Sequence, residues 1–453
     1  MKRIDVLPDD VLLEIFDFYL DGPPSFPQKT SIEAWQLLVH VCRRWRSLVF
    51  GSPRRLNLQL CCTSQTPTRD TLDIWPALPL IVEGIMASTS NTDSIIPALE
   101  QSNRIREVSL LNITGWQFEE VLPAMQVPFP ELTELQLFVL RETSPVLVNI
   151  PDSFLGGSAP RLRNIALCGI PYPGLPKLLL SATNLLELDL FGIREAEYIS
   201  PEAIVALISE LPSLEILLLV FETPESPSGE IQIRPPQRRA ILPALHDFRF
   251  DGATGYLEDL LNRIDTPQLH KMEISFFSQI DFDCPQLVQF IDRSPALRAS
   301  DEAHVEFGEE STGVALLALP RSLYIEISCV ELYRQLSSVA QICNSSFPPI
   351  STVEDLYIER QVHTSPLVWK NDGIETTLWS QFLLPFSAVK NLYISKEFAP
   401  GIADAIPQLV ADRTDLLPHL QNIFVEGRGP SSTSIASRQL SDHPIAISVW
   451  DRF

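Results

Sequence analysis

The chain has 453 residues, of which 45% are hydrophobic and 20% are charged. This balance is typical of a folded globular protein and not of a disordered one. The formal net charge of −23 argues against nucleic acid and against an anionic membrane as partners, because both attract lysine and arginine.

The amino terminus lacks the apolar stretch of a signal peptide, and no later run approaches the ~18 apolar residues of a membrane span. Seven cysteines, an odd number, fit reduced thiols better than a disulfide framework. We therefore expect a soluble intracellular protein of the cytoplasm or nucleus.

Residues 1–50 predict two amphipathic helices. Pro8 suits a first helical turn, and Asp9 and Asp10 place negative charge at the positive end of the helix dipole. A proline-rich loop separates this helix from a second one, which a capping box at 30–33 opens and Gly51 ends. Apolar residues recur at helical spacing on both helices: Val11, Leu12, Ile15, Phe16 and Tyr19, then Trp35, Leu38, Val39, Cys42, Trp45 and Val49.

Three segments, Leu7-Pro8, 41–46 and the exit at 52–56, resemble an F-box, the helical module that docks onto the Skp-family adaptor of cullin-RING ubiquitin ligases. Two short helices bury too little apolar surface internally, so some of it is expected to face a partner. An alternative is a helical pair that only caps the next domain. The resemblance implies that the adaptor is contacted by Leu7, Pro8, Leu12, Ile15, Phe16, Val41, Cys42 and Trp45.

From about residue 104 a pattern recurs in which apolar residues occupy the first, fourth and sixth positions. The first six clear copies follow one another at steps of 30, 23, 29, 31 and 24 residues, the period of a leucine-rich repeat. The copies begin at Leu132, Leu162, Leu185, Leu214, Leu245, Leu269, Val353, Val389 and Leu420. Helical patterns lie between them, near 201–211, 256–264, 287–292, 330–342 and 402–410.

The predicted fold is therefore α/β: a short N-terminal helical F-box followed by an irregular leucine-rich-repeat-like β/α solenoid. Its predicted parts are the helical module 1–50, a connecting segment and solenoid cap 51–103, the solenoid 104–427 with a loop insertion at 222–240, and a tail 428–453. The array resembles the irregular repeats often found behind an F-box. It departs from their consensus because Ile113, Leu140, Ile170 and Ile193 replace the usual asparagine or cysteine, and because 297–320 fits the pattern poorly.

Residues between and just after the last two consensus positions of each strand are expected on the inner, concave face of the solenoid. In the last four repeats these positions carry aromatic side chains flanked mostly by acids, which suits a peptide with an apolar anchor and a nearby lysine or arginine. The alternative is that the aromatic residues only stabilise the sheet. The hypothetical target-binding residues are Tyr324, Glu326, Tyr357, Glu359, Tyr393, Phe424 and Glu426.

The sequence offers no catalytic motif: GxGxxG, P-loop, GxSxG and HExxH patterns are absent, and the seven histidines are dispersed. We therefore expect no catalytic residue, no metal and no cofactor. The prediction is a substrate-recognition subunit of a Skp-cullin-F-box ubiquitin ligase that binds the adaptor and a protein target. The alternatives are an interaction scaffold outside any ligase and, third, an enzyme with an unrecognised site.

Overall fold

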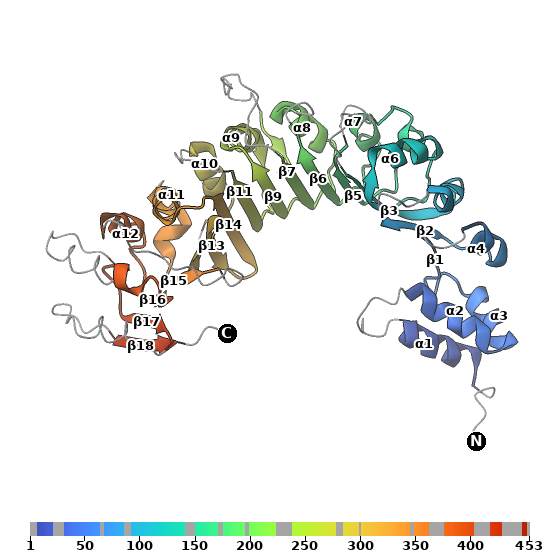
Figure 1. Cartoon of the computed structure of the whole chain (residues 1–453), viewed down its shortest axis with the longest axis horizontal. Coiled ribbons are helices and arrows are strands. Elements are labelled where there is room, and N and C mark those ends of the chain that lie inside the picture. The colour runs from blue at the N-terminus through green and yellow to red at the C-terminus, as the bar shows by residue number, and fades with distance from the viewer. Residues whose placement is uncertain are drawn as a thin grey trace. The chain divides into compact units, whose positions relative to one another are not determined.

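The structure, a computed structural model, describes residues 7–20, 31–63, 68–85, 92–140, 150–170, 175–194, 199–222, 238–277, 284–298, 300–344, 348–361, 376–402, 417–427 and 446–450. The chain divides into two compact units, Met1–Glu187 and Leu188–Phe453. Both contain largely parallel strands (Figure 1). The predicted α/β class, with short helices ahead of a long parallel array, is confirmed.

The first unit opens with three helices: α1 (Asp9–Leu20), α2 (Ser31–Val41) and α3 (Arg43–Gly51). Its described strands pair in parallel in chain order: β1 (Leu60–Thr63), β2 (Leu80–Ile85), β3 (Ile105–Thr114), β4 (Glu134–Leu140) and β5 (Asn164–Cys168). Three short helices lie between these strands in the chain, α4 (Thr68–Ile74), α5 (Ile96–Leu99) and α6 (Gly115–Val121), and α7 (Leu175–Leu179) follows β5.

The second predicted helix is in fact two helices, α2 and α3, separated by Cys42. The Cys42 backbone is extended, with φ −160° and ψ 169°, and its Sγ accepts a hydrogen bond from the backbone N–H of Trp45 at 3.5 Å. A side-chain acceptor at this position satisfies one of the free amides at a helix start. Cys42 therefore caps α3, whereas the sequence predicted it inside a continuous helix.

Parallel strands begin earlier than the predicted boundary at residue 104. β1 and β2 lie within the segment 51–103, and Leu80 of β2 pairs in register with Leu60 of β1 and with Ile105 of β3. These three side chains have no exposed surface. The segment predicted as a connection and cap thus supplies two strands of the array.

In the second unit, eleven described strands are hydrogen-bonded in the order β6-β7-β9-β11-β14-β13-β12-β15-β16-β17-β18. Their bounds in chain order are β6 (Glu187–Ile193), β7 (Ile216–Phe221), β9 (Asp247–Gly252), β11 (Lys271–Phe276), β12 (Glu302–Phe307), β13 (Ser311–Ala318), β14 (Arg321–Ser328), β15 (Asp355–Arg360), β16 (Asn391–Ile394), β17 (Asn422–Glu426) and β18 (Ala446–Trp450). A separate parallel pair joins β8 (Ala240–Ile241) to β10 (Ile264–Asp265). β8 lies at the end of the predicted loop 222–240, of which 223–237 fall outside the described residues.

The helices of the second unit lie on one side of these strands (Figure 1). They are α8 (Pro201–Ile208), α9 (Thr254–Arg263), α10 (Pro285–Arg293), α11 (Leu332–Asn344) and α12 (Thr376–Leu383). Four of them match predicted helical segments; the remaining prediction, 402–410, lies almost wholly outside the described residues. We call the opposite side of the strands the open face.

The consensus apolar positions form the core beneath the helices. Phe248 and Phe250 of β9, for example, are 0% and 2% exposed, and Leu392 and Ile394 of β16 are fully buried. Because side chains alternate along a strand, the residues between them lie on the open face. The repeat pattern therefore predicted which residues of each strand turn away from the helices.

Apolar side chains occupy the positions where the repeat consensus has asparagine or cysteine. Ile113 and Ile193 lie at the ends of β3 and β6, and Ile170 follows β5. All three are at most 2% exposed, so burial of a side chain stabilises each of these strand ends. Leu140 is the exception and is 45% exposed.

The stretch 297–320, which fits the repeat poorly, contains a hairpin inserted into the array. β13 runs antiparallel between β14 and β12, while β14 and β12 pair in parallel with β11 and β15 on their other sides. The predicted tail also contributes a strand, because β18 pairs in parallel with β17.

Within the described residues, no helix combines the length and apolar character needed to cross a membrane.

Candidate protein-interaction surfaces

The three N-terminal helices enclose a small core of their own. The rings of Phe16 on α1 and Trp45 on α3 pack edge to face with centroids 4.7 Å apart. Arg44 ties the same two helices together: it pairs with Asp9 at 2.6 Å and donates a hydrogen bond to the carbonyl of Leu7. α1 is thereby fixed against α3.

The residues predicted to contact the adaptor divide into exposed and buried groups. Pro8 is exposed, Ile15 and Val41 are 44% and 58% exposed, and Leu7, Cys42 and Trp45 are half-buried. Leu12 and Phe16 have no exposed surface. A partner would reach these two only if the helices separated, because they fill the interior of the module.

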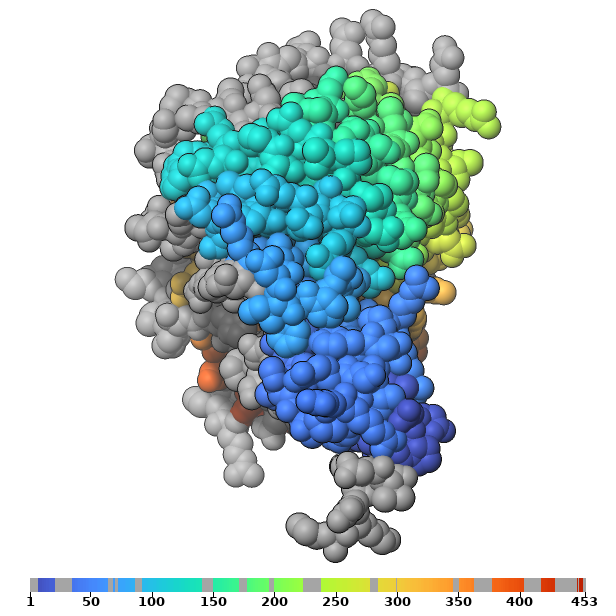
Figure 2. All heavy atoms as spheres, turned by 90° about the vertical axis from the view of Figure 1, so that its right-hand side faces the viewer, coloured from blue at the N-terminus to red at the C-terminus, as the bar shows by residue number. Residues whose placement is uncertain are grey.

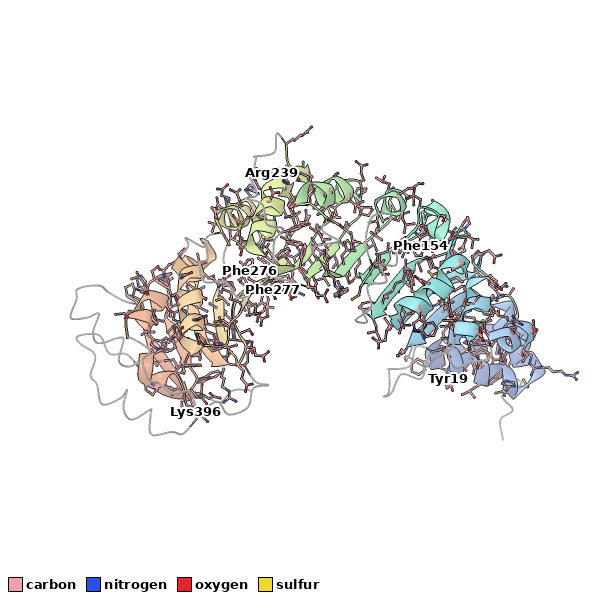
Figure 3. All side chains as sticks on the ribbon, turned by 45° about the horizontal axis from the view of Figure 1, so that its top comes forward. Tyr19, Phe154, Arg239, Phe276, Phe277 and Lys396 are labelled. Atoms are coloured by element: carbon pink, nitrogen blue, oxygen red, sulfur yellow. The ribbon has the colours of Figure 1, made fainter. Side chains whose placement is uncertain are left out.

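Further apolar side chains of the same helices are exposed. Phe18 and Tyr19 of α1 are 83% and 50% exposed, and Leu37 of α2 is 58% exposed. With Ile15 and Val41 they follow the helical spacings of three and four residues, which place side chains on one face of a helix. We call these five residues the apolar module surface; Tyr19 is labelled in Figure 3, and the helices are drawn in blue in Figure 2.

The module is anchored to the first strand segment by tryptophans. The indole N–H of Trp35 donates to the backbone carbonyl of Gln59 at 3.1 Å, directly before β1. The rings of Trp35 and Trp75 lie 5.1 Å apart, and Phe50 packs 6.3 Å from Trp75. This contact buries one side of the module and leaves the apolar module surface exposed.

On the open face of the second unit, four rings stack across neighbouring strands. His304 lies 4.2 Å from Tyr357, Tyr357 lies 4.2 Å from Tyr393, and Tyr393 lies 4.6 Å from Phe424. The interplanar angles are 3°, 6° and 9°, so the rings are nearly parallel. We call this set the aromatic ladder.

The ladder differs at one end from the row of aromatic residues that the sequence predicts on the last four repeats. Tyr324 on β14 does not neighbour Tyr357, because the inserted strand β13 and strand β12 separate them. Tyr324 is opposite Ala315 of β13, and the residue opposite Tyr357 is His304 of β12. The structure thus brings Tyr357, Tyr393 and Phe424 together, leaves Tyr324 apart, and adds a histidine that sequence reasoning missed.

Trp450 is a second missed residue. Its ring lies 5.6 Å from that of Tyr393 and 6.1 Å from that of Tyr357, at steep interplanar angles of 74° and 69°. It is carried by β18 and pairs in register with Glu426, one of the predicted target-binding residues. Trp450 therefore packs against the edges of the ladder.

Carboxylates surround the ladder and Tyr324. His304 contacts Glu359 at 3.3 Å and Glu302 at 3.7 Å. Burial by itself lowers the pKa of His304, but the hydrogen bond and charge of Glu359 and the charge of Glu302 raise it overall. Burial raises the pKa of Tyr324, and the charges of Glu326, Glu306 and Glu273 raise it further.

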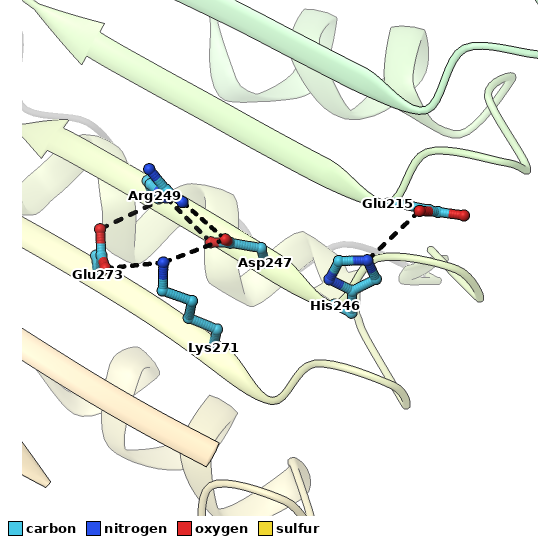
Figure 4. Close-up of polar contacts among 6 residues, drawn as sticks. All are labelled: Glu215, His246, Asp247, Arg249, Lys271 and Glu273. Atoms are coloured by element: carbon cyan, nitrogen blue, oxygen red, sulfur yellow. Dashed lines mark hydrogen bonds and ion pairs between the residues drawn. The ribbon is translucent and has the colours of Figure 1, made fainter. Parts of the chain in front are cut away.

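A network of four charged residues lies beside this region on β9 and β11 (Figure 4). Arg249 contacts Asp247 at 2.9 Å and Glu273 at 3.5 Å, and Lys271 contacts the same two carboxylates at 3.4 and 3.0 Å. Opposite charges alternate around this ring, so the network satisfies itself.

Comparison with models of known protein families and with curated protein sequences found no match. Among the described residues, no group of three or more histidine, cysteine, aspartate or glutamate side chains is arranged to hold a metal ion. The candidate sites are the apolar module surface in the first unit and the aromatic ladder in the second.

Proposed function

We propose that this protein is the substrate-recognition subunit of a Skp-cullin-F-box ubiquitin ligase. The helical module would dock onto the Skp-family adaptor, and the open face of the second unit would hold the target protein. The observation that carries the proposal is the apolar module surface, whose five exposed side chains lie on two helices ahead of a strand array. Large apolar side chains that are exposed together on one face of a helix are typical of a binding site.

The proposed mechanism is proximity. A target held by the second unit would stay near the conjugating enzyme carried by the ligase, which raises the effective concentration of its lysines. No residue of this chain is assigned a role in bond chemistry.

A second candidate is an interaction scaffold in which the module only caps the array. The observation that favours it is the packing of Trp35 against Trp75, together with the hydrogen bond to Gln59. This contact covers the start of β1, as a cap would. It does not account for the exposed side chains on α1 and α2.

Adaptor binding separates the two candidates. We expect the purified full chain to bind a purified Skp-family adaptor, and the double variant Ile15→Asp, Val41→Asp to bind about 100-fold more weakly or not at all, because two charges would enter an apolar interface. Titration calorimetry measures both affinities.

The matched control is Val127→Asp with Leu180→Asp, which places two aspartates at exposed apolar positions of the same unit, 43% and 56% exposed. The control is expected to bind as the parent chain does, with the same thermal midpoint. A parent chain that fails to bind the adaptor, or a module variant that binds normally, would refute the ligase assignment.

A further inference from the structure

An acidic row crosses the open face at β9, β11 and β14. Asp251, Ser275 and Glu326 are opposite one another in register, so the serine lies between two carboxylates. Glu326 accepts a hydrogen bond from the hydroxyl of Ser311 at 2.5 Å and lies 3.5 Å from that of Ser275. Hydroxyl partners solvate a carboxylate without neutralising it, so the charge of Glu326 remains.

The carboxylates of this row lie close enough to act on one another. Burial raises the pKa of Asp251, and the charge of Glu326 raises it further. The charges that raise the pKa of Tyr324 come from three different strands, through Glu326, Glu306 and Glu273.

Tyr324 is held next to this row by a small residue on the inserted strand. A Cβ atom at Gly313 would lie 2.6 Å from the hydroxyl oxygen of Tyr324, so only glycine allows the phenol to occupy its place. The ring is half-buried and leaves part of its surface open. An aromatic ring beside carboxylates suits the aliphatic stem and charged head of lysine or arginine.

The aromatic ladder supplies an apolar site on the same face. Tyr357, Tyr393 and Phe424 are stacked and each half-buried, so part of each ring remains exposed beside Trp450. Apolar ring edges next to Trp450 offer a contact for an aliphatic or aromatic side chain.

We propose that the open face of the second unit binds an extended basic segment of a protein target. A lysine or arginine of that segment lies over Ser275 between Asp251 and Glu326, and an apolar side chain of the same segment rests on the ladder at Tyr357 and Tyr393. This inference rests on the proposed function in that it treats the second unit as the target-binding part. Charge complementarity selects a basic segment over an acidic one.

The strand order sets the spacing of the two anchors. β11, which carries Ser275, is followed by β14, β13, β12 and β15, which carries Tyr357. Four strand spacings of ~4.8 Å make ~19 Å, which an extended chain covers in about six residues at ~3.3 Å each. The two strands of the inserted hairpin, β13 and β12, make this spacing longer than the sequence repeat alone would give.

The test uses the full chain and fluorescent synthetic peptides on a glycine-serine background. Each peptide carries one lysine and one phenylalanine, separated by about two to ten residues, and each has a partner peptide with glutamate in place of lysine. Fluorescence anisotropy gives the affinities. We expect the tightest binding at a separation of about six residues, and binding at least about tenfold weaker for the glutamate peptides.

The variant Asp251→Asn, Glu326→Gln is expected to bind the best lysine peptide about tenfold more weakly, with unchanged thermal unfolding. Its control, Asp292→Asn with Glu331→Gln, removes two charges from side chains that are 62% and 51% exposed at α10 and just before α11. This control is expected to bind as the parent chain does.

Adaptor binding is measured on the same preparation. Suppose that the chain binds the adaptor. This inference is then overturned, and the proposed function stands, if no peptide binds, if lysine and glutamate peptides bind equally, or if Asp251→Asn with Glu326→Gln leaves peptide binding unchanged. If the lysine peptide binds as expected but the adaptor does not, the inference stands and the proposed function fails.

Discussion

His304 shows how much one side chain depends on its neighbours in space. It stacks on Tyr357 and lies between Glu302 and Glu359, although 55 residues of sequence separate it from Glu359. This role could not be predicted from the sequence, because the strand that carries His304 fits no repeat consensus. Only the pairing of β12 with β15 places the imidazole at the end of the ladder.

The raised pKa of His304 predicts a pH-dependent contribution to stability. Because the folded chain binds this proton more tightly than the unfolded chain, the contribution is full below the ordinary histidine pKa of 6.5 and is lost as pH rises through the raised value. The side chain is 25% exposed, so solvent screening keeps the effect at about 1 kcal/mol or less.

We expect His304→Gln to have a lower free energy of unfolding than the parent chain. The difference should be larger at a pH below 6.5 than at a pH about two units above it. Urea denaturation of both proteins at the two pH values measures the difference. A difference that stays constant, or that grows as pH rises, would contradict the assigned environment of His304.

At the scale of an element, α1 has a buried side and an exposed side with different roles. Phe16 is fully buried against Trp45, whereas the neighbouring Ile15 is 44% exposed. Phe16→Ala is expected to destabilise the module by about 3 to 5 kcal/mol through the lost burial and the cavity left behind. Ile15→Ala is expected to cost less than about 1 kcal/mol.

Urea denaturation followed by tryptophan fluorescence compares the two variants, since Trp45 reports on the contact with Phe16. Adaptor binding should respond in a different way: Ile15→Ala should weaken it while the module remains folded. Equal loss of stability in both variants would mean that α1 does not pack as described.

The repeat strands could be predicted because the burial of alternate side chains produces the apolar pattern of their sequence. Apolar residues at alternate positions, such as Leu392 and Ile394, must face the helices, and the residues between them then face away. Local spacing could not reveal the break at Cys42, because Leu38 and Trp45 keep helical spacing across it. Nor could it reveal β13 or β18, whose places depend on strands distant in sequence.

The candidate sites were predictable to the same degree. Helical periodicity placed Ile15 and Phe16 on one apolar stripe, but which of them is buried depends on how α1 meets α3, so Leu12 and Phe16 were taken for contact residues. The exposed Phe18 and Leu37 lie outside the predicted stripes. The ladder was predicted at Tyr357, Tyr393 and Phe424, because adjacent repeats share a register. Tyr324 was misplaced because the inserted hairpin changes the order of the strands.

At the scale of the whole molecule, the proposed function makes this protein a bridge between an adaptor and a target. The first unit offers an apolar surface and the second an acidic, aromatic one, and the formal net charge of −23 favours a basic target. The two surfaces have different chemistry, so each can be disabled without altering the other. A single assay can therefore measure adaptor binding and peptide binding together.

That assay is retention of a labelled lysine-phenylalanine peptide on an immobilised Skp-family adaptor. The account predicts that the peptide is retained only when the full chain is present. Ile15→Asp with Val41→Asp should release both the chain and the peptide, whereas Asp251→Asn with Glu326→Gln should release the peptide alone. A chain that passes through the adaptor column unretained would contradict the account.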